Sequence, residues 1–165
     1  MQLEVFFDYV CPYCYQGHKN LLKLLPKYPE LAIIWRPCEA HPRPEPARIH
    51  SDLAIQGMYY VQERQGDLWK YHALVYAAHF DQGRNISDLS VLEQLAAECC
   101  SDGSGFHAAL MENRYAQKVE EGNRAAWEEY GFSAVPSYRS GPYQIGSRDG
   151  VLVPPHKLEQ FLASL

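Results

Sequence analysis

The sequence predicts an α/β protein, with a four-stranded mixed sheet flanked by helices and an all-helical domain inserted between its two halves. Three observations lead to this prediction. Short apolar segments of strand length lie near both ends of the chain, helical periodicity fills its middle, and the first strand passes directly into a helix. A strand–helix–strand unit followed by a strand–strand–helix unit makes one mixed sheet. We place the halves of the sheet domain at 1–40 and 129–165, and the helical insertion at 41–128.

The first half begins with a buried strand. The stretch LEVFFDY, residues 3–9, is short, apolar and aromatic, and it stops at a turn that contains proline. After Pro12, leucines recur at helical spacing on one face until Pro26, which ends or kinks the predicted helix. Residues 31–37, LAIIWRP, form the next strand. The segment 41–50 holds three prolines in five positions, so we expect it to be an extended crossing segment.

The middle of the chain, from about 51 to 130, has the pattern of several helices. Apolar residues recur at i, i+3 and i+4 in three stripes, and Asp88 is the predicted cap of the helix that carries the second stripe. The stripes consist of Trp69, His72, Ala73, Tyr76, Ala77 and Phe80, then Leu92, Leu95, Ala96 and Cys99, then Val119, Asn123, Ala126, Trp127 and Tyr130.

The end of the chain returns to strands. Gly131 ends the last helix of the insertion, and two short strands at 136–140 and 143–147 are close enough to form a hairpin. A helix entered through prolines, within 153–165, completes the domain. The segment therefore supplies the strand–strand–helix half of the predicted sheet.

Composition and charge exclude several classes of function. The 165 residues carry a formal net charge of −5 and no basic cluster, which argues against a nucleic-acid partner. No apolar run approaches the roughly 20 residues that span a bilayer, and the start of the chain lacks the features of a signal peptide, so we expect a cytoplasmic protein without a membrane partner. Five cysteines, an odd number, do not fit the disulfide framework of a small secreted domain. In a reducing cytosol, paired cysteines are more often catalytic or metal-binding.

The candidate active site is the CPYC motif, Cys11 to Cys14, between the first strand and the first helix. A thiol attacks as its thiolate, and the unpaired N–H groups at a helix N-terminus lower its pKa. Pro12 suits the first helical position, since its missing N–H would have no partner there. We therefore predict that Cys11 is the exposed nucleophile and that Cys14, one turn further on, is the shielded resolving thiol.

A zinc site and a purely structural turn are the alternatives for this motif. Zinc needs a second pair of ligands at finger-like spacing, and the sequence has no second CxxC and no HxxxH. Cys38, Cys99 and Cys100 are interpreted as small buried hydrophobic residues, and Cys38 is the best candidate among them for an accessory thiol. We expect no metal.

A second signal lies in the segment GFSAVPSY, 131–138. Pro136 stands at the entry to a predicted strand, and a cis proline there would leave the backbone of Val135 free to pair with an extended substrate peptide. Together with Pro12 and Tyr13 of the motif, Val135 and Pro136 make the candidate substrate-binding set.

Three polar residues near the motif have two interpretations each. Asp8 either accepts the proton of Cys14 or caps the turn that follows the strand. Glu4 could be a buried proton acceptor, and His18 could support a thiolate, but we expect both side chains at the surface.

These motifs give the chain a resemblance to the DsbA-like branch of the thioredoxin superfamily, and within it to the FrnE-type dithiol–disulfide oxidoreductases. DYVCPYCYQG, 8–17, resembles that group's D-x-V-C-P-W-C-Y-x-G signature, and IIWRPCEAHP, 33–42, resembles its W-R-P-x-x-x-x-P segment. GFSAVPSY is similar to its G-V-x-G-V-P-x-F loop, and HFDQGRNISDLSVLEQLA, 79–96, to the end of its helical insertion.

The resemblance implies a thioredoxin fold with an inserted helical domain, and thiol–disulfide exchange through a mixed disulfide. It implies Cys11 as nucleophile, Cys14 as resolving thiol, and Val135 with Pro136 as the docking element. It implies no metal and no bound organic cofactor. The partners would be protein or small-molecule thiols and disulfides, with thioredoxin or glutathione as electron donor, or glutathione as co-substrate.

Two other functions fit the same residues. Members of this branch that isomerise 2-hydroxychromene-2-carboxylate with glutathione, and kappa-class glutathione transferases, have a similar architecture but usually keep serine at the nucleophile position. A non-catalytic module that binds a peptide is the third alternative. The chain also departs from the FrnE-type group in a shorter helical block, in Tyr13, where tryptophan is usual, and in Cys38, where an apolar or aromatic residue is usual.

Overall fold

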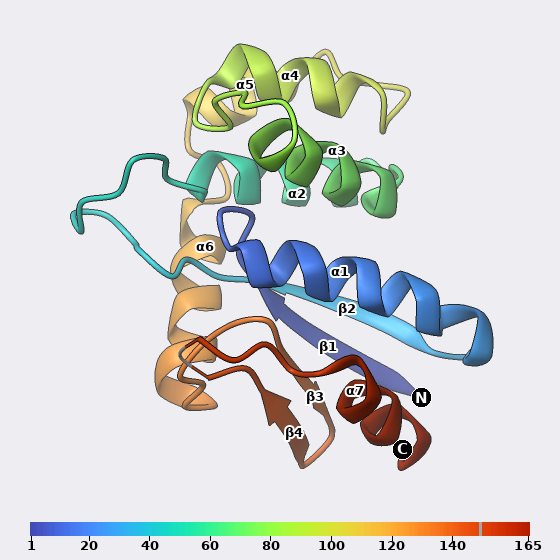
Figure 1. Cartoon of the computed structure of the whole chain (residues 1–165). Coiled ribbons are helices and arrows are strands. Elements are labelled where there is room, and N and C mark those ends of the chain that lie inside the picture. Colours follow the sequence, from blue (N-terminus) through green and yellow to red (C-terminus); the bar gives the residue numbers. More distant parts are fainter. Residues whose placement is uncertain (149) are drawn as a thin grey trace. The chain divides into compact units, whose positions relative to one another are not determined.

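The computed structural model describes residues 1–148 and 150–165, and its chain divides into two compact units (Figure 1). One unit comprises 1–40 and 122–165, and the other comprises 41–121. The second division falls within helix α6 (Ala116–Arg124), earlier in the chain than the expected boundary at 128. The assignment of folding domains stays a prediction.

The first unit contains the predicted four-stranded mixed sheet, which is confirmed. Its strands are β1 (Gln2–Phe7), β2 (Ala32–Pro37), β3 (Ser137–Ser140) and β4 (Tyr143–Gly146), in the order β2-β1-β3-β4. Strand β1 is parallel to β2 and antiparallel to β3, and β4 is antiparallel to β3. The central position of β1 explains why this strand is buried on both faces.

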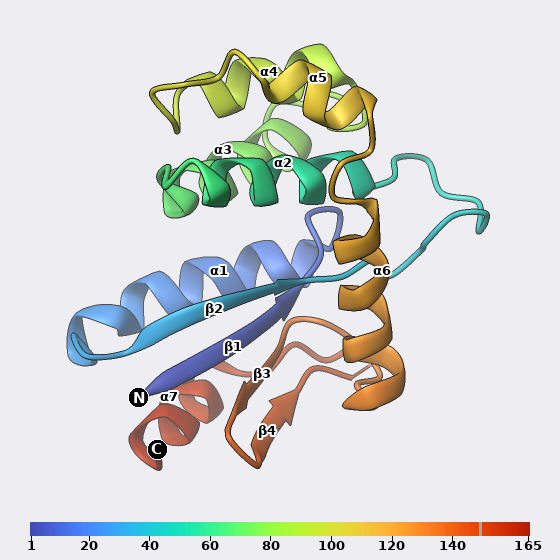
Figure 2. The same ribbon diagram turned by 180° about the vertical axis from the view of Figure 1, so that it is seen from behind.

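Helices α1 (Pro12–Leu24) and α7 (Pro155–Ala163) cover one face of this sheet, as Figures 1 and 2 show from opposite sides. The helix ends near Pro26, as predicted: this proline lies in a 3₁₀ turn, η1 (Leu25–Lys27), that directly follows α1. On the opposite face, the buried ring of Phe6 meets the rings of Tyr130 and Phe132, with centroids 5.6 and 4.9 Å away. These rings follow a π-helical segment, η2 (Ala125–Glu129), and Gly131, at φ +64°, ends it as predicted.

The second unit is helical. It contains α2 (Asp52–Glu63), α3 (Leu68–Phe80), α4 (Leu89–Ala97), α5 (Phe106–Met111) and the start of α6. Asp88 caps α4 as predicted, accepting the N–H of Ser90 at 2.9 Å. Within the described ranges 1–148 and 150–165, no helix is long and apolar enough to cross a membrane.

The buried face of α3 differs from the predicted stripe. Tyr71, His72, Val75 and Tyr76 are buried, whereas Ala73 is exposed. Apolar residues occur nearly all round this helix, so periodicity alone did not select the face that packs. The second stripe is buried as predicted, at Leu92, Leu95, Ala96 and Cys99.

Candidate active site

The start of α1 places a sulfur atom where other helices of this protein have a carboxylate. Cys11 is the N-cap of α1, with extended backbone angles of φ −93° and ψ 117°, and its Sγ accepts the N–H of Cys14 at 3.4 Å. Asp67 in α3 and Asp88 in α4 accept a first-turn N–H in the same way. This position favours a negatively charged acceptor, because helical N–H groups point toward it.

The two sulfurs of the motif have opposite acid–base properties. The pKa of Cys11 is lowered from its usual value by a hydrogen bond from the Cys14 side chain and, against the opposing effect of burial, by the backbone N–H groups of Cys14 and Tyr13. Cys14 is only 1% exposed, and burial followed by the bond to Cys11 raises its pKa well above the usual value. Cys11 is therefore the cysteine of the pair that ionises first, and Cys14 keeps its proton to higher pH.

Asp8 lies directly behind the pair and is completely buried. Its backbone N–H donates to the Sγ of Cys14 at 3.4 Å. Its carboxylate accepts the N–H of Ala40 at 2.8 Å and the N–H of Val10 at 3.3 Å, and these bonds offset the cost of burying the charge. The charge of Asp8 raises the pKa of both cysteines, so it helps Cys14 to keep its proton.

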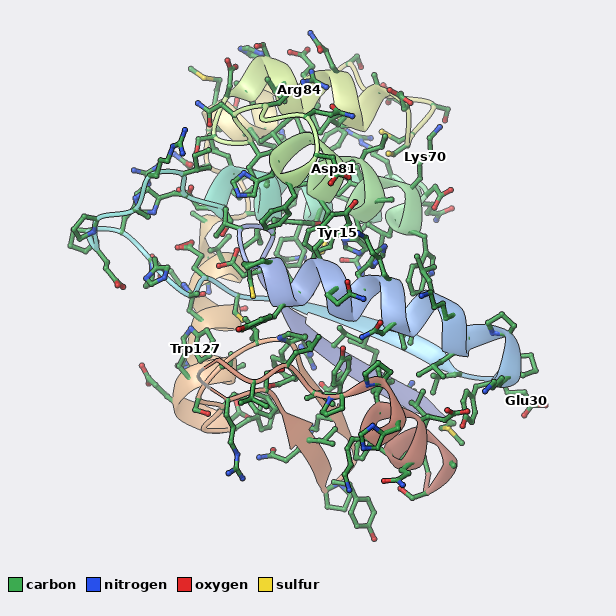
Figure 3. All side chains as sticks on the ribbon, viewed as in Figure 1. Tyr15, Glu30, Lys70, Asp81, Arg84 and Trp127 are labelled. Carbon is green, nitrogen blue, oxygen red and sulfur yellow. The ribbon has the colours of Figure 1, made fainter. Side chains whose placement is uncertain are left out.

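The segment that supplies the Ala40 amide is itself anchored. Glu39 donates its N–H to Oδ1 of Asn123 at 2.6 Å, and its carbonyl accepts the indole N–H of Trp127 at 2.9 Å. Figure 3 labels Trp127 on the helical segment that follows α6. A chain of hydrogen bonds thus runs from this segment to Asp8 and on to Cys14.

The proline loop, residues 133–136, meets the motif across 124 positions of sequence. Its Val135–Pro136 peptide bond is cis, and the Sγ of Cys11 donates to the carbonyl of Val135 at 3.5 Å. Pro12 and Tyr13 are exposed, the latter at 38%, whereas the side chain of Val135 is buried. The structure therefore brings the nucleophile candidate together with the backbone of the loop.

Gly17 allows this approach, and the sequence reasoning did not single it out. A Cβ atom at Gly17 would lie 2.8 Å from Cγ of Pro136 and 2.9 Å from the hydroxyl of Tyr138. Only glycine lets α1 sit this close to the proline ring. The signal was available, since Gly17 is the last residue of the D-x-V-C-P-W-C-Y-x-G pattern.

Cys38 is fully buried next to the motif, as the packing interpretation expected. Its thiol lies 3.7 Å from the carbonyl oxygen of Phe7, whereas Cys14 contacts the N–H of Asp8, the other side of the same peptide group. Burial raises the pKa of Cys38 well above its usual value. In the described part of the chain, 1–148 and 150–165, no group of three or more His, Cys, Asp or Glu side chains is arranged to hold a metal ion.

Two expectations about polar residues were wrong. His18 is buried against Trp35, with ring centroids 6.3 Å apart, and burial lowers its pKa to about 4, so it is neutral at physiological pH and cannot support a thiolate as a cation. Glu4 is also buried, because Arg36 and Arg139 each donate to its carboxylate at 2.6 Å. It shares its face of the sheet with Phe6, opposite α1, and so lies away from the cysteines.

Comparison with known proteins agrees with this architecture. The profile of the DSBA-like thioredoxin domain matches residues 2–148. YwbO of Bacillus subtilis, an uncharacterised protein, is 26% identical over 91% of this chain and 92% of its own. Among solved structures, the cytosolic disulfide reductase DsbM from Pseudomonas aeruginosa with GSH has a TM-score of 0.75 at 18% identity, covering 99% of this chain and 98% of DsbM. A 2-hydroxychromene-2-carboxylate isomerase has a TM-score of 0.71 at 17% identity, covering 99% and 94%.

Proposed function

The chain belongs to the family of DSBA-like thioredoxin domains, and we propose that it is a dithiol–disulfide oxidoreductase of the FrnE type that acts on protein disulfides or thiols. The observation that carries the proposal is the unequal pair of sulfurs at the start of α1. The pKa of Cys11 is lowered and that of Cys14 is raised. Cys11 would therefore be the nucleophile that attacks first, and Cys14 the resolving thiol that reacts in the second step.

The proposed reaction has two exchanges. The Cys11 thiolate attacks one sulfur of a substrate disulfide, the S–S bond breaks, and the other substrate sulfur leaves as a thiolate that takes up a proton. Cys14 then loses its proton, attacks Sγ of Cys11 and expels the second substrate thiolate. Two electrons have passed from the dithiol to the substrate, and the reverse sequence oxidises a substrate dithiol. Asp8, whose buried carboxylate raises the pKa of Cys14, is the candidate acceptor of its proton.

The substrate-binding residues in this proposal are Pro12, Tyr13, Val135 and Pro136. The mixed disulfide on Cys11 would be held against the proline loop, whose Val135 carbonyl lies 3.5 Å from the sulfur. Pro12 and Tyr13 follow Cys11 directly in the chain, and both are exposed.

We assign the reductive direction to the enzyme, in a cytoplasmic setting with thioredoxin or glutathione as electron donor and no bound cofactor. A reducing compartment keeps a catalytic dithiol reduced. The similarity to DsbM, described as a cytosolic disulfide reductase and solved with GSH, supports this assignment. A reduction potential far more oxidising than the glutathione pool would contradict it.

Trapping tests the mechanism. We expect Cys14→Ser, purified under non-reducing conditions, to carry substrates as mixed disulfides, because the resolving attack is blocked. The matched control, Cys11→Ser, keeps the buried thiol and should carry none. The captured molecules are identified by mass spectrometry after reduction. The mechanism fails if neither variant traps a partner, or if both trap equally.

A glutathione-dependent isomerase or transferase is the second candidate, and the structural similarity to 2-hydroxychromene-2-carboxylate isomerase supports it. In that case turnover would require glutathione and survive Cys14→Ser, because no internal disulfide forms. A non-catalytic peptide-binding module is the remaining alternative. It requires that the wild-type protein fail to reduce insulin when a thiol donor is supplied.

A further inference from the structure

Ser147, directly after β4, forms hydrogen bonds with the proline loop. The side chain is 2% exposed, and its hydroxyl donates to the carbonyl of Pro136 at 2.6 Å. The backbone N–H of the same serine donates to this carbonyl at 3.1 Å. Both lone pairs of the Pro136 oxygen are therefore used by one residue, which fixes the direction of the carbonyl.

The hydroxyl of Ser147 has a defined orientation. Its oxygen accepts the N–H of Val153, just before α7, at 3.1 Å, so its single proton is directed to Pro136. The hydroxyl thus joins the loop to the segment that leads into α7. A proline cannot anchor itself through an N–H, and its carbonyl is the backbone group left for that purpose.

The two carbonyls of the loop point to different partners. The Pro136 carbonyl accepts the hydroxyl of Ser147, and the Val135 carbonyl, one residue earlier, accepts a hydrogen bond from the thiol of Cys11. On the other side, the proline ring is seated on Gly17. The loop is therefore held between α1 and Ser147, and a rotation of the Pro136 carbonyl would also turn the Val135 backbone that faces the sulfur.

We propose that Ser147 is a positioning residue for substrate docking: it holds the Val135–Pro136 backbone in the orientation that an extended peptide disulfide needs beside Cys11. The inference rests on the proposed thiol–disulfide exchange. It adds that Ser147 acts on the binding of extended substrates and not on the reactivity of the thiol, since the bonds that lower the pKa of Cys11 come from the motif itself.

The test compares a dye-quenched disulfide peptide with the small disulfide DTNB. In Ser147→Ala we expect the KM for the peptide to rise about 3- to 10-fold, as for the loss of one buried hydrogen bond, with kcat within about twofold. The rate at which the reduced protein reduces DTNB should stay at the wild-type value. The pH midpoint of Cys11 alkylation should also be unchanged. The matched control is Ser140→Ala, which removes a serine bond of 2.7 Å to the Gln2 carbonyl at the other end of β3 and should change neither reaction.

A pair of variants isolates the hydroxyl from packing. Ser147→Thr and Ser147→Val have nearly the same shape, and only the former can donate to Pro136. Thr should restore a KM near that of wild type and Val should not, even if Ser147→Ala fails to fold. A peptide KM within twofold of wild type in a folded Ala or Val variant overturns the proposal, as does an equal loss with both disulfides. If wild type reduces neither disulfide, the proposed function itself has failed.

Discussion

Helices α1 and α4 each carry two cysteines, but at opposite ends. Helix α1 begins at Cys11, with Cys14 in its first turn, whereas Cys99 and Cys100 follow the last turn of α4. At the start of a helix the free groups are N–H donors, and Cys11 Sγ accepts one of them. At the end they are carbonyl acceptors, and the thiols of Cys99 and Cys100 each donate to the carbonyl four residues earlier, at 3.3 Å.

The consequence is opposite chemistry for the same side chain. Burial raises the pKa of Cys99 to about 11 and also raises that of Cys100. Cys11 is partly buried as well, but its hydrogen bonds from Cys14 outweigh that effect and lower its pKa. The pKa of each thiol follows the groups around it: hydrogen bonds from Cys14 lower the pKa of Cys11 at the start of α1, whereas burial raises the pKa of both cysteines that follow α4.

The largest expected effect is therefore a difference in reactivity between the two pairs. The thiolate is the reactive form, so alkylation of Cys11 should rise with pH through a midpoint below that of an ordinary thiol, and alkylation of Cys99 through a midpoint of about 11. At pH 7 only about one Cys99 in ten thousand is ionised. Iodoacetamide pulses from pH 5 to 11, read by peptide mass spectrometry, measure the Cys11 midpoint and show whether the reactivity of Cys99 is still rising at pH 11.

Cys14 provides the control for this prediction. Its hydrogen bond is the largest cause of the lowered pKa of Cys11, so Cys14→Ala should move the Cys11 midpoint upward. Cys14→Ser should move it less, because a hydroxyl still donates. The midpoint of Cys99 should not change in either variant. Equal midpoints for Cys11 in wild type and Cys14→Ala would contradict the assignment of the proton to Cys14.

Much of this site was predictable because its elements are local. The first strand and helix are adjacent in the chain, so the helix N-terminus beside Cys11 and the proline at its first position could be predicted from residues 3–24 alone. The stops at Pro26 and Gly131 and the cap at Asp88 are local in the same sense. Each depends on backbone geometry that a few residues determine.

One of the two incorrect expectations about polar residues depended on partners distant in sequence. Glu4 is buried because Arg36 and Arg139, from the two neighbouring strands, donate to its carboxylate. These pairs depend on the register between strands, which the sequence of one strand does not show. His18 was a local error: it follows Cys14 by four residues and precedes Leu21 by three, so it lies on the buried face of α1.

A smaller effect is expected at Gly17, where α1 is fitted to the proline loop. Alanine is favoured over glycine in a helix by about 1 kcal/mol, but the added Cβ would lie 2.8 Å from a rigid proline ring. We expect the clash to dominate, with Gly17→Ala lowering the free energy of unfolding by about 1–3 kcal/mol in urea titrations. Gly103→Ala is the matched control, since a Cβ there has no neighbour within 4 Å. If Gly17→Ala is as stable as wild type or more stable, the proline loop shifts to make room for the added Cβ atom, and the expected clash is absent.

The smallest effect tests whether Cys11 really holds a capping position. Asp88→Ala removes the cap of α4 and should lower the free energy of unfolding by a small amount, with no change in the Cys11 midpoint. At α1, Cys11→Asn supplies a neutral cap, so it avoids the repulsion that a carboxylate would feel from buried Asp8. It should be more stable than Cys11→Ala by a similar amount, although both are inactive. If Asn and Ala are equally stable at position 11, the sulfur does not occupy a true cap, and the lowered pKa of Cys11 must come from the side-chain hydrogen bond of Cys14 and not from the backbone N–H groups.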